Sequence, residues 1–309
     1  MSRNLYSKKA FVAPLLRLFA SGRRLSFAAA FLVCAASSAT ADKAAVARGA
    51  YLAAAGGCDQ CHTDSKNGGS PYSGGRVLQT EFGSITTPNI TPDVATGIGG
   101  WSGNDFVQAM RWGIAPDGTH YVPAFPFPYF AGLTDSDLAD LKAFLGSLMP
   151  VTQPRAAGAG SLALLARARA AIGMAIAVNV NPLPAMSEED TVVSRGAYLV
   201  ATVGYCGSCH TPRSWLGAPD PDRFLAGSRG GLEGAKAPHI TPEPKTGIGT
   251  WSEDDITSLL KDGGTPDGDF VGGAMAEIVR NTARLTDADR RAIAAYLKTV
   301  PAKPFVDHE

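Results

Sequence analysis

The sequence predicts an all-α fold that is built from two tandem domains. The first observation is an internal repeat: short segments of residues 42–150 return in the same order in residues 187–309, and Arg48-Gly-Ala-Tyr-Leu returns unchanged at Arg195. The second observation is that helix start signals fall at matching places in both copies. A chain of 309 residues also has room for two domains of the usual about 100–200 residues each.

Each copy is expected to hold three main helices. They begin near residue 44, after Ser102 and after Thr134 in the first copy, and near residue 187, after Ser252 and after Thr286 in the second. At the serines and threonines, the side chain can accept hydrogen bonds from the free N–H groups of the first turn, and an aspartate follows three residues later. In the last helix of the first copy, Leu138, Leu141 and Leu145 recur with helical spacing.

The first helix of each copy ends in the pattern Cys-x-x-Cys-His, at Cys58–His62 and Cys206–His210. This pattern is typical of covalent attachment of a c-type haem. Two thiols one helical turn apart can form thioethers with the two vinyl groups of one porphyrin, and the adjacent imidazole reaches the iron. We therefore expect two covalently bound haem c groups. The predicted attachment residues are Cys58, Cys61, Cys206 and Cys209, and the predicted proximal iron ligands are His62 and His210.

Two other uses of paired cysteines fit the sequence less well. A structural zinc site usually places its second pair within about 15–20 residues of the first, whereas these pairs lie 148 residues apart. A thioredoxin-like motif needs one pair only and does not explain a histidine after both pairs. The fifth cysteine, Cys34, lies near the N-terminus, so no thiol remains for a disulfide.

Long loops rich in glycine and proline separate the helices, for example over residues 68–100 and 217–249. Loops of this length are uncommon in a compact domain unless they have a function. Wrapping a buried porphyrin is such a function, and the haem then supplies core that the short helices alone would not. The sequence therefore predicts haem-wrapping loops in both domains.

Residues 151–186 do not take part in the internal repeat and form a connector rich in Ala, Gly and Pro. Its apolar stretch, Leu162–Val178, is interrupted by Arg167 and Arg169. We interpret this stretch as a linker helix packed between the domains and not as a membrane span. A helix lying on a membrane surface is the alternative.

Residues 1–41 are typical of a secretory signal peptide. They contain six basic and no acidic residues, an apolar run over Leu25–Ala36, and an Ala-x-Ala cleavage site before Asp42. A retained anchor is the alternative, but the apolar run is shorter than the about 20 residues that span a bilayer. We therefore expect a periplasmic protein that is secreted through a cleaved signal peptide.

The charge balance after cleavage favours some partners over others. From Asp42 onward, the chain carries 22 basic and 28 acidic residues. A mildly acidic surface steers a protein towards a basic partner, and it does not predict binding to nucleic acid.

The sixth iron ligand is predicted separately for each haem. Met275 follows the second copy of Pro-Asp-Gly and precedes the last helix, in a segment that reads as a flexible loop, so its thioether is the expected ligand of the second iron. The same position in the first copy is Phe125 or Pro123, depending on which repeated segment is aligned. His120 is then the candidate sixth ligand of the first haem, with an ordinary surface or core histidine as the alternative. Met110, within the expected helix after Ser102, reads as a core residue.

Taken together, these motifs resemble those of the periplasmic di-haem and tri-haem cytochromes c, including the cytochrome subunits of membrane-associated alcohol, gluconate and aldehyde dehydrogenases. The shared segments stand at Arg48–His62, Pro88–Asp93, Thr96–Trp101, Tyr121–Phe127 and Leu133–Asp137. The resemblance implies two tandem class I cytochrome c-like domains. It also implies a periplasmic or membrane-associated dehydrogenase as electron donor, a terminal oxidase or quinone-linked acceptor, and scope for peripheral membrane contact.

Two departures from that family bear on the expectations. The resemblance leads us to expect a chain without the third haem domain and the membrane-binding tail of the tri-haem subunits, and Phe125 stands where many relatives have Met. The expected function is electron transfer between a dehydrogenase and the respiratory chain. The alternative is a di-haem oxidoreductase of the peroxidase or sulfur-compound type that uses an open first haem.

Overall fold

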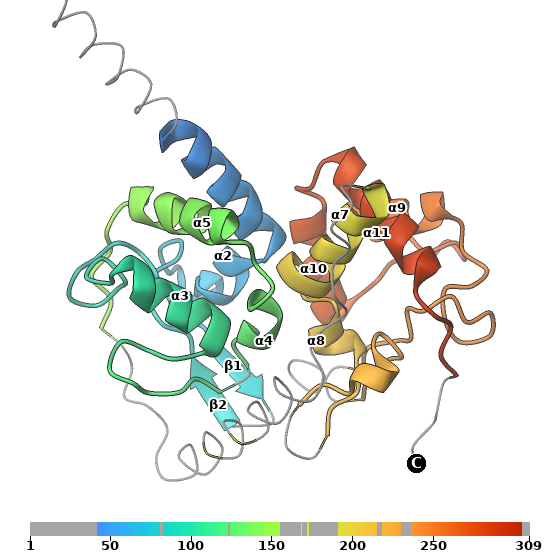
Figure 1. Ribbon diagram of the computed structural model, residues 1–309, viewed down its shortest axis with the longest axis horizontal. Helices are drawn as coiled ribbons and strands as arrows, with labels where there is room; N and C mark the ends of the chain where they lie inside the picture. Colours follow the sequence, from blue (N-terminus) through green and yellow to red (C-terminus); the bar gives the residue numbers. More distant parts are fainter. Residues whose placement is uncertain are drawn as a thin grey trace, which may run out of the picture. The chain divides into compact units, whose positions relative to one another are not determined.

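Helices make up most of the regular structure (Figure 1). The chain is seen in a computed structural model that describes residues 42–80, 83–122, 124–154, 168, 172, 191–214, 218–229 and 236–304. The predicted signal peptide, nearly all of the predicted linker helix and the predicted start of the second-copy helix near residue 187 lie outside the described residues. Below, the first half means residues 42–154 and the second half means residues 191–304.

The two halves contain matching helices in the same order. The first half has a helix over residues 42–55, then α2 (Cys58–Cys61), η1 (Ser65–Asn67), α3 (Gly103–Trp112), α4 (Phe127–Phe130) and α5 (Asp135–Ser147). The second half has α7 (Val192–Tyr198), η2 (Leu199–Val203), α8 (Gly207–His210), η3 (Pro221–Arg223), α9 (Glu253–Asp262), α10 (Gly273–Thr282) and α11 (Asp287–Thr299). Helix α3 contacts α4 and α5, and α11 contacts α7 and α9.

The four helix starts predicted after Ser102, Thr134, Ser252 and Thr286 are confirmed. The Ser102 side chain accepts from the backbone N–H of Asp105, whose carboxylate accepts from the Ser102 N–H, and Ser252 forms the same box with Asp255. At the last helices, the Thr134 hydroxyl accepts from Asp137 and the Thr286 hydroxyl from Asp289. These caps use residues three positions apart, which explains why the sequence alone located them.

A glycine lets the first and last helices of each half cross at close range. A Cβ atom on Gly49 would collide with the Asp140 carbonyl of α5, and one on Gly196 would collide with the Ala292 carbonyl of α11. Figure 1 shows α5 alongside the helix of residues 42–55. Beside the first crossing, Arg48 forms an ion pair with the buried Asp140 at 2.6 Å. The repeated Arg-Gly pair therefore marks a helix crossing in each half.

The second half carries one residue more than the first between this crossing and its Cys-x-x-Cys-His motif. Arg48 precedes Cys58 by ten positions, whereas Arg195 precedes Cys206 by eleven. The chain takes up the additional residue in the π-helical segment η2, where the Gly204 N–H donates to the Leu199 carbonyl five residues back at 2.7 Å. Both the crossing and the motif thus keep their places despite the insertion.

The fold is mostly helical, as predicted, and it adds one short β-hairpin that the sequence analysis did not predict. Within the loop expected over residues 68–100, β1 (Val77–Thr80) and β2 (Gly83–Thr86) pair antiparallel, with Leu78 opposite Ile85. Leu78 is buried and anchors this hairpin. Each strand is four residues long, which is too short for its alternation to stand out between glycine-rich flanks.

Buried side chains from both halves form one apolar core. It joins Leu52 and Phe130 of the first half with Leu199 and Leu225 of the second. Within the part of the chain that is described, no helix combines the length and the apolar character that a membrane crossing would need.

Candidate functional site

Each half presents two cysteines and a histidine on one short helix. In the first half Cys58 and Cys61 lie on α2 and His62 caps its end, while in the second half Cys209 and His210 lie on α8 and Cys206 precedes it. None of these four cysteines forms a disulfide. The structure thus brings together, within each half, every residue that was predicted to attach a haem.

The histidines are oriented by a proline carbonyl in each loop. The Nδ1 atom of His62 lies 2.8 Å from the Pro88 carbonyl oxygen, and Nδ1 of His210 lies 2.7 Å from that of Pro238. A carbonyl only accepts, so Nδ1 carries the proton, and Nε2 is left as the nitrogen for an iron. Burial lowers the pKa of both histidines, which favours the neutral imidazole that binds metal. The two sites therefore have the same proximal arrangement.

The loop residues that follow each proline are tied down by side chains. In the first half the Asn89 carbonyl oxygen accepts from the Thr91 N–H and hydroxyl at 2.9 and 2.8 Å. In the second half His239 takes the place of Asn89, and its ring contacts the hydroxyls of Thr241 and Thr246. His239 therefore fastens the loop through threonines, in accordance with a role other than iron binding.

The first cysteine of each motif has a raised pKa in the folded chain. Burial raises the pKa of Cys58 and of Cys206 to about 12. The thiolate is the nucleophilic form of cysteine, and a thiol with so high a pKa stays protonated at neutral pH.

The residues present fit a c-type haem. Two thiols on one helical turn, followed by a neutral imidazole whose Nδ1 is already engaged, are the donor set that such a haem needs. The same set occurs in both halves with proline contacts that differ by 0.1 Å. Because the same arrangement occurs in both halves, chance does not explain the grouping of two cysteines and one histidine at each site.

Met275 does not lie in the flexible loop that was expected. It stands in the first turn of α10, a ten-residue helix that begins at Gly273. The sequence did not predict the start of α10 because Val271-Gly-Gly-Ala resembles a loop. The glycines at residues 272 and 273 have no side chain that could cap a helix. Met275 is half-buried. It stays the predicted sixth ligand of the second haem, now carried on a helix.

The residues considered as sixth ligand of the first haem lie in other surroundings. His120 is exposed, and its backbone pairs with Ile114 across a turn, as Phe270 pairs with Gly264 in the second half. Its exposure does not favour iron binding, and His120 stays a prediction from the sequence. Met110 is buried in the core on α3, as expected. Pro123 lies outside the described residues.

Phe125 belongs to a row of aromatic side chains. Its ring centroid lies 5.8 Å from that of Tyr121 and 5.6 Å from that of Phe130. Edge-to-face and tilted contacts at these distances are favourable for aromatic pairs. Aromatic rings therefore fill the part of the first half that corresponds to the Met275 region of the second.

The first attachment motif contacts α10 of the second half. The Asn281 side chain donates to Gln60 Oε1 at 2.7 Å, and Gln60 in turn donates to the Glu277 carbonyl. Arg284, just beyond α10, pairs with Asp59 at 2.6 Å. The helix that carries Met275 thus also binds the haem motif of the other half.

The second motif contacts α4 of the first half in a corresponding way. Gly207, between its two cysteines, lies so close to the Tyr129 ring that an added Cβ would come within 3.0 Å of it. Tyr129 is almost fully buried. Both motifs therefore lie against the opposite half, each beside the segment that precedes that half's last helix.

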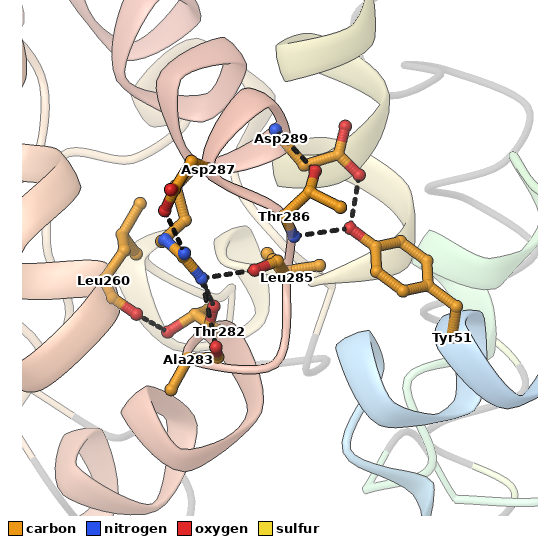
Figure 2. Close-up of polar contacts among 9 residues, drawn as sticks. Tyr51, Leu260, Thr282, Ala283, Leu285, Thr286, Asp287 and Asp289 are labelled. Atoms are coloured by element: carbon orange, nitrogen blue, oxygen red, sulfur yellow. Dashed lines mark hydrogen bonds and ion pairs between the residues drawn. The ribbon is translucent and has the colours of Figure 1, made fainter.

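A reciprocal pair of tyrosines joins the two halves. Tyr51 donates to the Asp289 carboxylate at 2.6 Å and accepts from the Thr286 N–H at 3.1 Å, as Figure 2 shows. Tyr198 makes the same two contacts in the opposite direction, with Asp137 and with the Thr134 N–H. The two tyrosines are the same residue of the repeated Arg-Gly-Ala-Tyr-Leu segment. Each first helix therefore caps the last helix of the other half.

Sequence reasoning missed these contacts between the halves. The repeat singled out both tyrosines, but no local pattern names their partners, which lie 61 and 238 residues away. Nothing in the sequence marked Glu277, Asn281 or Arg284. Glu277 also forms an ion pair with Arg76 of the first half at 3.1 Å.

The loop after Pro238 gives a prediction about acid stability. Glu243 accepts from the Thr246 N–H at 2.6 Å and the Thr246 hydroxyl at 2.8 Å. These hydrogen bonds to Thr246 lower the pKa of Glu243 from 4.5 to about 2. A carboxylate with a lowered pKa contributes stability above pH 4.5 that is lost as the pH falls towards about 2.

We expect Glu243→Gln to remove this contribution, so that the thermal stability of the variant falls less steeply over that pH interval. Differential scanning calorimetry of both proteins as a function of pH measures the difference. Parallel curves for the two proteins would contradict the role given to this carboxylate.

Comparisons with known proteins agree with the geometry. A family model for cytochrome c matches residues 46–149 and 193–301. The chain is 43% identical over 260 residues to the diheme cytochrome c-type protein of Cereibacter sphaeroides. The aligned region covers 82% of this chain and 86% of that protein. It is 38% identical over 277 residues to the gluconate 2-dehydrogenase cytochrome c subunit of Pantoea cypripedii. It is 39% identical over 273 residues to the cytochrome c subunit of the quinone-dependent alcohol dehydrogenase of Gluconobacter oxydans.

The lengths of these relatives differ. The matches to the gluconate and alcohol dehydrogenase subunits each cover 85% of this chain, but only 61% and 56% of the subunits themselves. A fructose dehydrogenase cytochrome subunit from Gluconobacter japonicus is matched over 54% of its length at 37% identity. The chain thus spans little more than half of the dehydrogenase subunits that it resembles.

Proposed function

Because the chain belongs to the cytochrome c family and holds two covalently bound haem c groups, we propose that it carries electrons in the periplasm from a dehydrogenase to the respiratory chain. Each haem supplies a one-electron couple between ferrous and ferric iron. The protein supplies the proximal histidines, the apolar surroundings and the surfaces that partners contact.

The observation that carries this proposal is the placement of the two attachment motifs. Gln60 of the first motif bonds to α10, and Gly207 of the second lies against Tyr129 of α4. Haems bonded to these motifs would therefore both be held where the two halves contact each other. An electron that enters one half can then leave from the other, which suits a carrier with separate donor and acceptor surfaces.

The identity of the partners is proposed from the relatives and the charge. Three of the relatives are cytochrome subunits of gluconate, alcohol and fructose dehydrogenases, so we propose a dehydrogenase as donor and a terminal oxidase or quinone-linked protein as acceptor. The acidic excess after Asp42 suits steering towards a basic partner surface. Contact with the membrane would be peripheral.

The test uses the holoprotein, matured in a host that attaches c-type haem, and host membranes that contain a candidate dehydrogenase. Gluconate, ethanol or fructose is added in turn, and the reduced haem absorption is followed with and without the protein. We expect one substrate to reduce both haems, at a rate that falls as salt screens the contact. Reduction by dithionite alone, with no dehydrogenase substrate active, would contradict the proposal.

A second candidate function rests on Phe125. Its ring, packed between Tyr121 and Phe130, occupies the region of the first half that corresponds to Met275, and a phenyl ring does not bind iron. An iron without a protein ligand on that side can take a small molecule instead. This is the arrangement that a di-haem oxidoreductase of the peroxidase or sulfur-compound type requires.

Phe125→Met distinguishes the two candidates. For an open first haem, the reduced wild-type protein should bind one carbon monoxide per two haems, and the variant should bind none because the new thioether closes the site. Optical titration with carbon monoxide gives this stoichiometry. A wild-type protein that binds no carbon monoxide in its reduced state removes the oxidoreductase candidate and leaves the carrier.

A further inference from the structure

We infer that Tyr205 is a positioning residue that holds the two haem attachment motifs in register for electron exchange between the haems. The inference rests on the proposed function, since it concerns electrons that pass from one half to the other. In that exchange a ferrous iron in one half becomes ferric, and the ferric iron of the other half becomes ferrous. One electron moves, and no proton or further reactant is required.

The backbone at Tyr205 is the first observation. Tyr205 stands directly before Cys206 and has a φ of 38°, in the left-handed region that a bulky side chain rarely adopts. The same position before Cys58 is Gly57, with a φ of 62°. The fold therefore requires this conformation in front of both motifs, and in the second half a tyrosine adopts it where a glycine would be free of strain.

The contacts of the ring are the second observation. The Tyr205 ring meets the Phe130 ring edge-on, with 5.5 Å between centroids. Phe130, on α4 of the first half, lines a small cavity together with Cys58. The ring of Tyr205 thus reaches, through Phe130, the wall of a cavity that the first motif also lines.

The surroundings of the hydroxyl agree with this placement. Burial raises the pKa of Tyr205 well above its ordinary value, and the thiols of Cys61, Cys58, Cys209 and Cys206 all lie near enough to add to the effect. Tyr205 also packs against the same apolar core as Cys58 and Cys206, one attachment cysteine from each half.

The two halves fill the equivalent space in different ways. A Cβ atom on Gly57 would collide with the Asn281 side chain, which reaches across from α10 to bind Gln60. In front of the second motif the chain supplies its own side chain, Tyr205, and that ring reaches across to α4. Each motif is thus braced against the other half, once by a neighbour's asparagine and once by its own tyrosine.

The alternative is that Tyr205 only fills the core and that its strained backbone is tolerated. The two explanations predict opposite outcomes for Tyr205→Gly. If the ring only fills space, its loss leaves a cavity that lowers the stability of the fold, but the exchange of electrons in the folded protein continues unchanged. If the ring sets the register of the motifs, electron exchange between the haems slows even though the backbone strain at residue 205 is relieved.

The experiment measures electron exchange within the holoprotein by pulse radiolysis, in which one electron per molecule is introduced and its redistribution between the haems is followed optically. We expect Tyr205→Gly to slow this step about tenfold or more, because small displacements of reacting groups are costly in rate. Tyr205→Phe keeps the ring and should restore the wild-type rate. A wild-type rate in Tyr205→Gly would overturn the inference.

Two controls separate the possible causes. Tyr51→Phe removes a hydrogen bond between the halves that involves no residue of either motif, so a similar loss there would mean that any weakening of the contact has this effect and would overturn the role given to Tyr205. Haem content and the two reduction potentials are measured for every variant. A wild-type protein that no dehydrogenase reduces, but whose haems still exchange electrons in a Tyr205-dependent way, would reject the proposed function and keep the inference.

Discussion

Replacing Gly196 with alanine should destabilise the second half by about 3 kcal/mol or more, and Gly49→Ala should do the same to the first. In both cases the new methyl group would meet a backbone carbonyl of the last helix, Ala292 or Asp140. A backbone carbonyl cannot rotate away as a side chain can, so the two helices must separate. Because the two halves share one apolar core, they should melt together, and for a unit of more than about 200 residues we expect the melting temperature to fall by about 6–12 °C.

Gly146→Ala is the matched control for this prediction. Gly146 lies in α5, the same helix that Gly49 approaches, but no atom lies within 4 Å of its would-be Cβ. Alanine is the better helix former, so this variant should gain up to about 1 kcal/mol. Calorimetry of the three variants provides the comparison. Equal melting temperatures for Gly49→Ala and Gly146→Ala would show that the close crossing does not occur.

Met275→Ala is expected to have the largest effect on the redox properties. If the Met275 thioether binds the second iron, its loss lowers that haem's reduction potential by a sizeable part of the range of about 0.8 V that axial ligands span. The weak near-infrared charge-transfer band from the methionine sulfur to the ferric iron should disappear at the same time. A redox titration followed optically, together with a near-infrared spectrum of the oxidised protein, measures both changes.

Met149→Leu is the control for the methionine assignment. Met149 lies just after α5 and is 83% exposed, so its replacement should leave both potentials and the near-infrared band unchanged. A near-infrared band that survives in Met275→Ala and vanishes in another methionine variant would reassign the ligand. Met110, buried on α3, is the methionine to test next in that event.

The parts of the fold that could be predicted from the sequence depend on neighbours in the chain. The Ser102 box and the Thr134 cap need only residues three positions away. The attachment motifs likewise occupy five consecutive residues each, so their chemistry could be predicted before their surroundings were known. For these features, local hydrogen bonding and covalent chemistry decide the structure.

The parts that could not be predicted depend on contacts between distant residues. Helix α10 begins at two glycines with no capping side chain, and its stability comes from packing and from its contacts with Gln60. The bracing of the motifs involves residues more than 200 positions apart, such as Gln60 and Asn281. The role of Tyr205 depends on its backbone conformation and on a ring in the other half, neither of which the sequence displays.

The most direct test of the central claim is the rate of electron exchange between the haems of the wild-type holoprotein at several protein concentrations. If the two halves form one relay, an electron introduced by pulse radiolysis should redistribute with a single rate that does not depend on concentration. A rate that rises in proportion to protein concentration would mean that electrons pass only between molecules. That result would contradict the joint arrangement of the two haem sites.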